Sequence, residues 1–109
     1  MNAQLNYAGV LAANWQDIAA QSVADGIYER LLWQGENGSR ALVYEFSPGT
    51  SFGVDAHEAG PEQIYVISGV FNDGRDDHPP GSFIHNPAGS VHVPQSAQGC
   101  VVLVIYPQG

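Results

Sequence analysis

Short runs of β-forming residues, separated by glycine and proline turns, recur along most of this 109-residue chain. From residue 27 onward, β-branched, aromatic and leucine side chains gather in stretches of strand length. These stretches are 27–33, 41–46, 51–57, 63–68, 82–86 and 101–106. Turn signals such as Gly35-Glu-Asn-Gly38 and His78-Pro-Pro-Gly81 stand between them. Many short strands without a helix-length pattern indicate an all-β barrel or jelly roll.

The composition fits one turn-rich domain that spans residues 1–109. Thirteen glycines, seven prolines and 44% hydrophobic residues, with only 13% charged residues, are typical of a folded β protein. A chain of this length can bury one core. Residues 1–24 form an N-terminal extension with a weaker pattern. Asn14 can cap a short helix with Asp17 in its first turn, and an edge strand with a loop is the alternative.

Charge and cysteine content exclude several classes of function. The formal net charge is -8, and the three basic residues are all arginines, so we expect no binding to nucleic acid or to an anionic membrane. Without lysine the chain cannot form a Schiff base. Cys100 is the only cysteine, so no intramolecular disulfide can form, and we interpret it as a small buried hydrophobe. With no secretory signal or transmembrane stretch in the sequence, we expect a cytoplasmic protein.

Two histidines and two carboxylates have the spacing of a metal site. Asp55 and His57 are two residues apart, so on a strand their side chains leave the same face. Glu62 follows across a Gly-Pro turn, and His92 comes from a distant segment introduced by Pro87-Ala-Gly89. Imidazoles and carboxylates suit a divalent transition metal. We therefore predict a metal site at these four residues, although Asp55 can equally be a solvated turn residue.

Other polar and aromatic residues receive more ordinary interpretations. Glu58 directly follows His57, so it should face away from the site and lie on the surface. His78, before a Pro-Pro turn, and His85, inside a strand, are interpreted as structural residues, with a position at a cavity mouth as the alternative. Four aromatic residues are open to two interpretations, as side chains that line a cavity or as core residues: Phe52, Tyr65, Phe83 and Tyr106. Arg75 is also open to two, as an anion contact or as a plain loop residue. No catalytic residue is identified by the sequence.

The two segments that carry the candidate ligands resemble the two signature motifs of the cupin superfamily. The first motif falls on Gly49, Asp55, His57, Glu62 and Gly69, and the second on Gly81, Pro87, Gly89 and His92. The match covers about residues 41–106, which we take as the barrel core. More narrowly, residues 61–71 and 86–92 resemble the cupin domain of ChrR-type anti-sigma factors and of stand-alone relatives that include acetylacetone-dioxygenase-like proteins.

This resemblance implies a jelly-roll barrel, also called a double-stranded β-helix, with a divalent metal inside it. It also shows a departure, because Asp55 stands where the motif has the first histidine of a His-x-His pair. Aspartate coordinates through oxygen and adds negative charge, so the site becomes harder and favours Fe(II) or Mn(II) over zinc. We expect one of Fe(II), Zn or Mn as the cofactor.

Three functions remain open from the sequence. The first is a ChrR-like module in which the metal supports a pocket for a small-molecule ligand. The second is an Fe(II)-dependent, dioxygenase-like enzyme acting on a small chelating substrate such as a β-diketone. The third is a degenerate cupin with a structural or dimerisation role. A complete anti-sigma factor is not expected, because the N-terminal 40 residues contain no cysteine for its zinc-binding domain. We expect a homodimer.

Overall fold

The computed structural model describes residues 3–57 and 60–109, and it is almost entirely β. The predicted all-β fold is therefore confirmed. The largest sheet has six antiparallel strands in the order β1 Gln21–Ala24, β2 Ile27–Gln34, β3 Arg40–Phe46, β12 Cys100–Tyr106, β6 Glu62–Gly69 and β9 Phe83–Asn86. A four-stranded sheet has the order β4 Thr50–Ser51, β11 Gln95–Ser96, β7 Phe71–Asn72 and β8 Asp77–His78. A two-stranded sheet pairs β5 Asp55–Ala56 with β10 Val91–His92.

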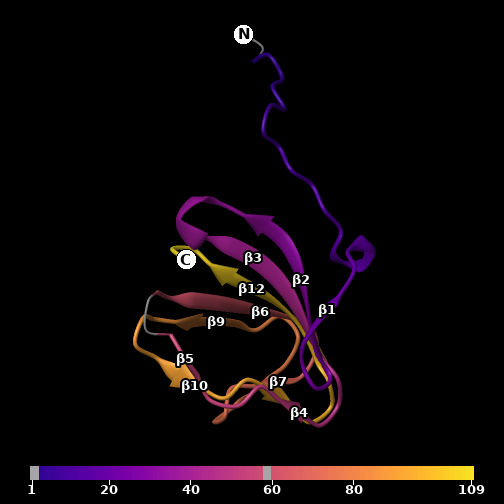
Figure 1. The fold of residues 1–109 in the computed structure, drawn as a ribbon, viewed down its shortest axis with the longest axis vertical. Coiled ribbons are helices and arrows are strands. Elements are labelled where there is room, and N and C mark those ends of the chain that lie inside the picture. The colour runs from indigo at the N-terminus through magenta and orange to yellow at the C-terminus, as the bar shows by residue number, and fades with distance from the viewer. Residues whose placement is uncertain (1–2, 58–59) are drawn as a thin grey trace.

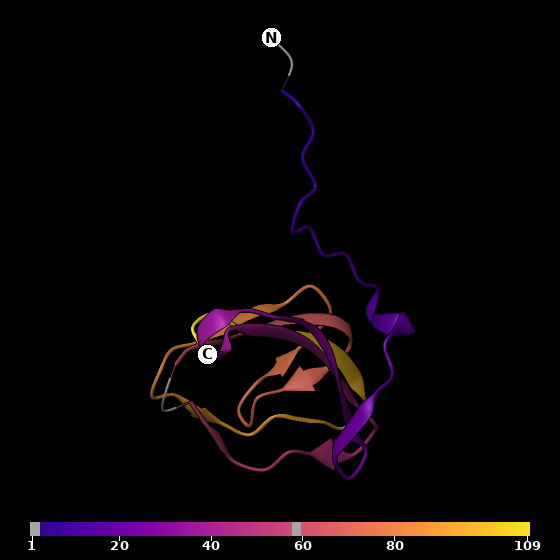
Figure 2. The ribbon, with the colours of Figure 1, turned by 45° about the horizontal axis from the view of Figure 1, so that its top comes forward.

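The sheets face one another as the layers of a jelly roll. The large sheet curves over the smaller ones, and β5 and β10 lie across the interior from β3 and β12 (Figure 1). After a 45° turn, the strands are seen to surround the interior of the roll (Figure 2). The buried side chains of the core lie in this interior. Antiparallel strands in such a roll bring segments that are far apart in the sequence onto one interior surface.

Alternate residues of the central strands form the core. Val102 of β12 is paired with Tyr44 of β3 on one side and with Val66 of β6 on the other. Because side chains alternate across a strand, these residues share the inner face. The buried cluster consists of Ile27, Phe46, Ile64, Val66, Phe71, Cys100, Val102 and Val104. The predicted burial of Cys100 is confirmed, since it is 5% exposed.

Most of the predicted strands are present, but one is divided. The predicted run 51–57 overlaps two separate short strands, β4 and β5, and both pair with strands from the C-terminal part of the chain. The predicted turn at 35–38 holds a 3-10 turn, η2 Glu36–Gly38, in which Asn37 has φ of 61°. Glu58, predicted to lie on the surface, falls outside the described residues.

The N-terminal segment contains less helix than the sequence allowed. The helical part is a single 3-10 turn, η1 Trp15–Asp17, and the Asn14 side chain accepts a hydrogen bond from the Gln16 backbone N–H at 3.0 Å. The predicted cap at Asn14 is confirmed. Before it, residues 3–13 run away from the barrel as an extended arm (Figures 1 and 2). Within the described chain there is no helix with the length and apolarity that a membrane crossing requires.

Candidate metal centre

Three neighbouring elements position the four predicted ligands. Asp55 of β5 and His92 of β10 are directly paired across the two-stranded sheet. His57 follows β5, and its backbone N–H donates to the Ser90 carbonyl at 2.9 Å, which ties this segment to the chain before β10. Glu62 opens β6 on the large sheet. The structure thus brings together side chains that are up to 37 positions apart in the chain.

The donor atoms of these residues converge on one point. The two histidines approach each other through Nε2 at 2.8 Å. The Glu62 Oε1 atom lies 3.1 Å from His57 Nε2 and 3.4 Å from His92 Nε2. Asp55 Oδ2 lies 3.5 Å and 3.4 Å from the same two nitrogens. All four donor atoms fall within 4.8 Å of one another.

These separations fit a single divalent cation. Nitrogen and oxygen ligands bind such ions at about 2.1 Å, so neighbouring donors around one ion stand ~3.0 Å apart in an octahedral arrangement and ~3.4 Å apart in a tetrahedral one. The five separations between donor atoms given above run from 2.8 to 3.5 Å. Imidazole and carboxylate together suit iron, manganese and zinc. The residues present therefore fit the metal that the fold family implies.

Burial strengthens the case for a cation. The side chains of His57 and His92 are each 7% exposed and that of Glu62 is 5% exposed, whereas the side chain of Asp55 is 32% exposed. A buried carboxylate is costly unless an opposite charge or hydrogen-bond donors accompany it. The described residues place no lysine or arginine among the contacts of these carboxylates. A divalent cation supplies the opposite charge that the cluster lacks.

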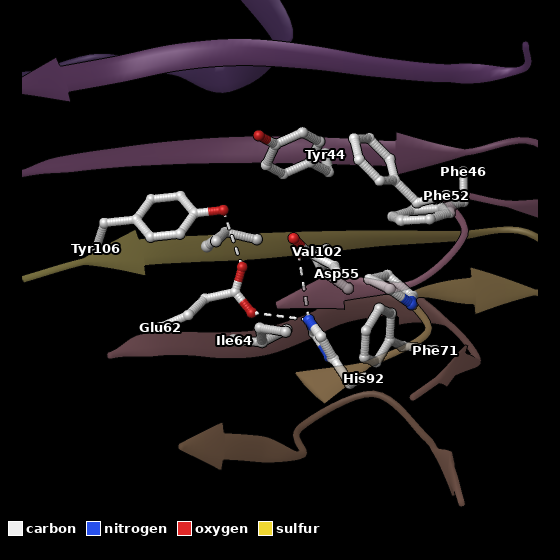
Figure 3. A pocket seen from close by; sticks show the side chains of 12 residues that line it. Tyr44, Phe46, Phe52, Asp55, Glu62, Ile64, Phe71, His92, Val102 and Tyr106 are labelled. Carbon is white, nitrogen blue, oxygen red and sulfur yellow. Dashed lines mark hydrogen bonds and ion pairs between the residues drawn. The ribbon is translucent and has the colours of Figure 1, made fainter. Parts of the chain in front are cut away.

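Glu62 is held in place by two further side chains. The Tyr106 hydroxyl donates to Glu62 Oε2 at 2.9 Å (Figure 3). Asn86 Nδ2 donates to Glu62 Oε1 at 3.2 Å. Burial, followed by the nearby Glu62 charge, raises the pKa of Tyr106, so its hydroxyl stays protonated and remains a donor. The Arg40 guanidinium packs 4.2 Å from the Tyr106 ring centroid. One oxygen of Glu62 is thus fixed by Tyr106, and the other faces the histidines.

His92 differs from His57 in its environment. Its Nδ1 atom is buried and has no hydrogen-bond partner among the described residues. Histidines that bind metal usually donate their second ring N–H to a carbonyl or carboxylate, which fixes the ring. The orientation of the His92 ring therefore depends on the pairing of β10 with β5 and on packing in the cavity wall.

A cavity of about 160 Å³ adjoins the donor cluster. Its wall combines three candidate ligands with mostly apolar side chains: Asp55, Glu62 and His92, with Tyr44, Phe46, Phe52, Ile64, Phe71, Pro94, Val102, Val104 and Tyr106 (Figure 3). Phe52 is 42% exposed, and Val54, two residues later in the chain, is 74% exposed. A small ligand in this cavity lies against the donor cluster and within an apolar enclosure.

The structure separates the remaining candidates. Phe52 and Tyr106 line the cavity, which is one of the two positions that the sequence left open for them. Tyr65 and Phe83 are cross-strand neighbours with exposures of 44% and 61%, and neither belongs to that cavity or to the buried core. Arg75 lies in an exposed loop and pairs with Asp76 at 2.9 Å.

The two other histidines have structural contacts. His78 Nε2 lies 2.9 Å from Asp73 Oδ2, and Asp73 Oδ1 accepts the backbone N–H groups of Arg75 and Asp76. Partial burial acts to raise the pKa of Asp73, but the hydrogen bonds outweigh it and hold that pKa at about 2. His85 lies 3.4 Å from the Gln63 side chain and is exposed.

Two contributors to the site were not predicted in their roles. Tyr106 was interpreted only as a cavity-lining or core aromatic, and Asn86 was not singled out. Both contact Glu62 because β6 lies between β12 and β9, with Glu62 opposite Asn86 and Gln63 opposite Ile105. No spacing in the sequence carries that strand order, so no sequence signal marks these two residues as partners of Glu62.

Comparison with known proteins identifies the family. The family model of the ChrR cupin-like domain matches residues 8–108. The chain belongs to the ChrR cupin-like family. No curated protein sequence matches this cupin.

Solved structures share the fold of this cupin. The polyketide cyclase RemF from Streptomyces resistomycificus is 26% identical, with a TM-score of 0.81, over 92% of this chain and 80% of RemF. The anti-sigma factor ChrR, in complex with SigE of Rhodobacter sphaeroides, is 19% identical with a TM-score of 0.74, over 85% of this chain and 50% of ChrR. A putative acetylacetone dioxygenase from Methylibium petroleiphilum PM1 is 14% identical with a TM-score of 0.79, over 97% of this chain and 80% of that chain.

Proposed function

We propose that this cupin holds one divalent metal ion and binds a small chelating ligand at the positions of the ion that the protein leaves open. The convergence of four donor atoms beside a 160 Å³ cavity is the observation that carries this proposal. In the proposed arrangement His57, His92 and Glu62 are the principal ligands, because they are buried and their donor atoms lie closest together. Asp55, more exposed and slightly farther away, is the fourth and weaker ligand.

The cavity volume limits the size of the ligand. A cavity of about 150 Å³ in another protein accommodates benzene, so a molecule of roughly six to eight non-hydrogen atoms fits here. A 1,3-dicarbonyl unit is of this size and offers two oxygens to one cation. The apolar walls formed by Phe52, Ile64 and Val104 suit its carbon substituents.

An enzyme is the second candidate, and the likeness to RemF favours it. RemF is a polyketide cyclase, and a polyketide chain carries repeated 1,3-dicarbonyl units. A bound divalent cation polarises carbonyl groups and makes the hydrogens between them more acidic. Around it, Tyr106 keeps Glu62 oriented, the aromatic walls exclude water, and the partly exposed Asp55 carboxylate lies where it can accept a ligand proton. The Fe(II)-dependent dioxygenase-like activity expected from the sequence is a further form of this candidate.

Ligand binding is tested by thermal unfolding with acetylacetone as the probe. Protein loaded with Fe(II), Mn(II) or Zn is compared with metal-free protein and with His57→Ala. We expect the melting temperature of the metal-loaded protein to rise by roughly 6–10 °C when the diketone is present at ten times its Kd. Absence of any shift in all three metal-loaded forms, with the metal present in stoichiometric amount, contradicts the proposal.

The same samples distinguish binding from turnover. Oxygen uptake by the Fe(II) form, or loss of the diketone in any form, assigns an enzyme. Stabilisation without consumption of ligand or oxygen assigns a binding module of the ChrR-like type. The cytoplasmic location expected from the sequence remains a prediction that belongs to this proposal.

A further inference from the structure

The cavity beside the candidate metal centre has a polar end and an aromatic end. Glu62 and Tyr106 lie toward one end, and Phe46, Phe52 and Phe71 lie toward the other (Figure 3). The rings of Phe46 and Phe71 meet edge to face, with centroids 6.0 Å apart and an interplanar angle of 75°. Because Glu62 belongs to the donor cluster, a ligand that chelates a metal there directs its carbon substituent toward the aromatic end.

Phe52 separates this aromatic end from solvent. It is 42% exposed, whereas Phe46 and Phe71 are 5% and 1% exposed. Within residues 3–57 and 60–109, the other lining residues with purely hydrocarbon side chains are all buried. A side chain that lines a cavity and also reaches solvent forms part of the boundary between the two. The Phe52 ring therefore ends the cavity on its aromatic side.

The backbone at Phe52 is held independently of its ring. Phe52 lies between β4 and β5, and its backbone N–H donates to the carbonyl of Pro94, another lining residue, at 2.8 Å. The Gly53 N–H donates to the Ser51 side chain, and Val54 is 74% exposed, so the chain after Phe52 runs along the surface. We therefore expect that the Phe52 side chain can be shortened without loss of the barrel.

The volume of the cavity leaves little space beyond a chelating head group. About 160 Å³ accommodates roughly six to eight non-hydrogen atoms. Acetylacetone falls within this range, whereas benzoylacetone, in which a phenyl ring replaces one methyl group, exceeds it. Forcing additional atoms into a filled interior is unfavourable. At the aromatic end Phe46 and Phe71 are part of the buried core, so the added phenyl group meets the Phe52 ring as the wall that can yield.

We propose that Phe52 determines which ligands the cavity accepts, because its ring restricts the substituent at the aromatic end to about the size of a methyl group. This inference rests on the proposed function, since it concerns the same chelating ligand. Phe52 contacts the substituent and is not one of the four donor residues. It is a specificity-determining residue, and its replacement leaves the metal content of the protein unchanged.

The exchange of a phenyl group between protein and ligand tests the proposal. Phe52→Ala removes a phenyl ring from the cavity wall, and benzoylacetone adds one to acetylacetone. The full chain is loaded with the metal that it binds stoichiometrically and is kept under nitrogen, and calorimetric titration gives a Kd for each diketone. The ratio of the two Kd values is then compared between variant and wild type, so that intrinsic differences between the diketones cancel. We expect Phe52→Ala to shift this ratio about 10-fold or more in favour of benzoylacetone.

Two further variants complete the experiment. Phe83→Ala is the matched control, because Phe83 is 61% exposed and does not line the cavity, and it should keep the wild-type ratio. Phe52→Leu retains an apolar side chain and should shift the ratio in the same direction by a smaller factor, which also serves if Phe52→Ala does not fold. Circular dichroism and metal content of each variant confirm that the barrel and the donor cluster are intact.

The results separate this inference from the proposed function. If wild type binds acetylacetone but the folded Phe52 variants keep the wild-type ratio, Phe52 does not select the ligand and the inference is wrong, while the proposed function stands. An equal shift in Phe83→Ala also overturns the inference. If the metal-loaded wild type binds neither diketone, the proposed function is contradicted, and the inference that rests on it is contradicted as well.

Discussion

At the scale of single residues, the Glu62 carboxylate is the most constrained member of the candidate metal centre. Its two oxygens have different partners, since Oε2 accepts from Tyr106 and Oε1 faces His57 and His92. A carboxylate fixed in this way presents one oxygen to a cation without first losing side-chain freedom. Residues that orient ligands in this manner commonly change metal affinity by about 10–100-fold.

Replacing Tyr106 with phenylalanine removes the donor and keeps the ring. We expect Tyr106→Phe to fold normally and to bind metal about 10-fold more weakly, because Glu62 loses its hydrogen bond and gains mobility. Competition with a chromogenic chelator measures the change. Tyr65→Phe is the control, because Tyr65 is 44% exposed and lies outside the cavity wall. Equal affinities for Tyr106→Phe and wild type mean that Tyr106 does not support the site.

The Tyr106 hydrogen bond stabilises Glu62, whereas the His92 Nδ1 atom has no hydrogen-bond partner among the described residues. A ring that binds metal through Nε2 carries its proton on Nδ1, and a buried N–H without an acceptor costs about 1–3 kcal/mol. The candidate centre therefore combines Glu62, which two hydrogen bonds hold in place, with His92, whose Nδ1 has no hydrogen-bond partner among the described residues.

The four donor residues were predictable, and their supporting contacts were not. The motif spacing specifies Asp55, His57, Glu62 and His92 because each stands at a fixed distance from a turn glycine or proline. The contact of Glu62 with Tyr106 depends on which strands become neighbours, and that depends on packing of the whole chain. Metal binding by the four residues stays a prediction until a metal is measured.

At the scale of elements, glycines at strand ends control how closely the strands approach. Gly69 ends β6 with φ of +73°, and a Cβ there would collide with the Gly99 carbonyl oxygen and lie 2.7 Å from the Cys100 Cα. The close approach lets β6 pair with β12 through an irregular register near Val101 and Val102. Glu62 at the start of β6 is thereby placed beside Tyr106 at the end of β12.

Two glycines of the first motif provide a matched pair of substitutions. Gly49 has a similar φ of +77°, but a Cβ at Gly49 would meet no other atom within 4 Å, whereas Gly69 is crowded by backbone. We expect Gly49→Ala to cost about 1 kcal/mol, from the left-handed backbone alone, and Gly69→Ala to cost about 3 kcal/mol or more. Urea unfolding measures both. Equal costs show that backbone conformation, and not strand contact, explains Gly69.

The predictability of elements follows their length. The strands β2, β3, β6 and β12 have seven or eight residues each, enough to show a β pattern, and all four overlap predicted runs. The strands β5 and β10 have two residues each. Two residues carry no periodicity, so their pairing, which places Asp55 beside His92, emerges only from closure of the roll.

At the scale of the whole molecule, the barrel buries its apolar side chains, whereas the N-terminal arm leaves them exposed. The barrel brings the four candidate ligands from distant segments together beside an interior cavity, and its fold is that of a cupin. The arm carries exposed apolar side chains outside the barrel. The sequence predicted the barrel from its turns and motifs, but the exposed arm appeared only in the structure, because residues 3–13 have no clear pattern.

The central claim is that the donor cluster holds one metal ion, and elemental analysis of the purified full chain tests it most directly. Protein is prepared without added metal and again after incubation with Fe(II), Mn(II) and Zn, followed by desalting. His85→Ala is the control for the loss of a histidine, because His85 is exposed and does not belong to the cluster. We predict about one metal ion per chain in wild type and His85→Ala, and less than about a tenth of that in His57→Ala and His92→Ala. Metal-free wild type under every loading condition, or unchanged metal content in both ligand variants, contradicts the claim.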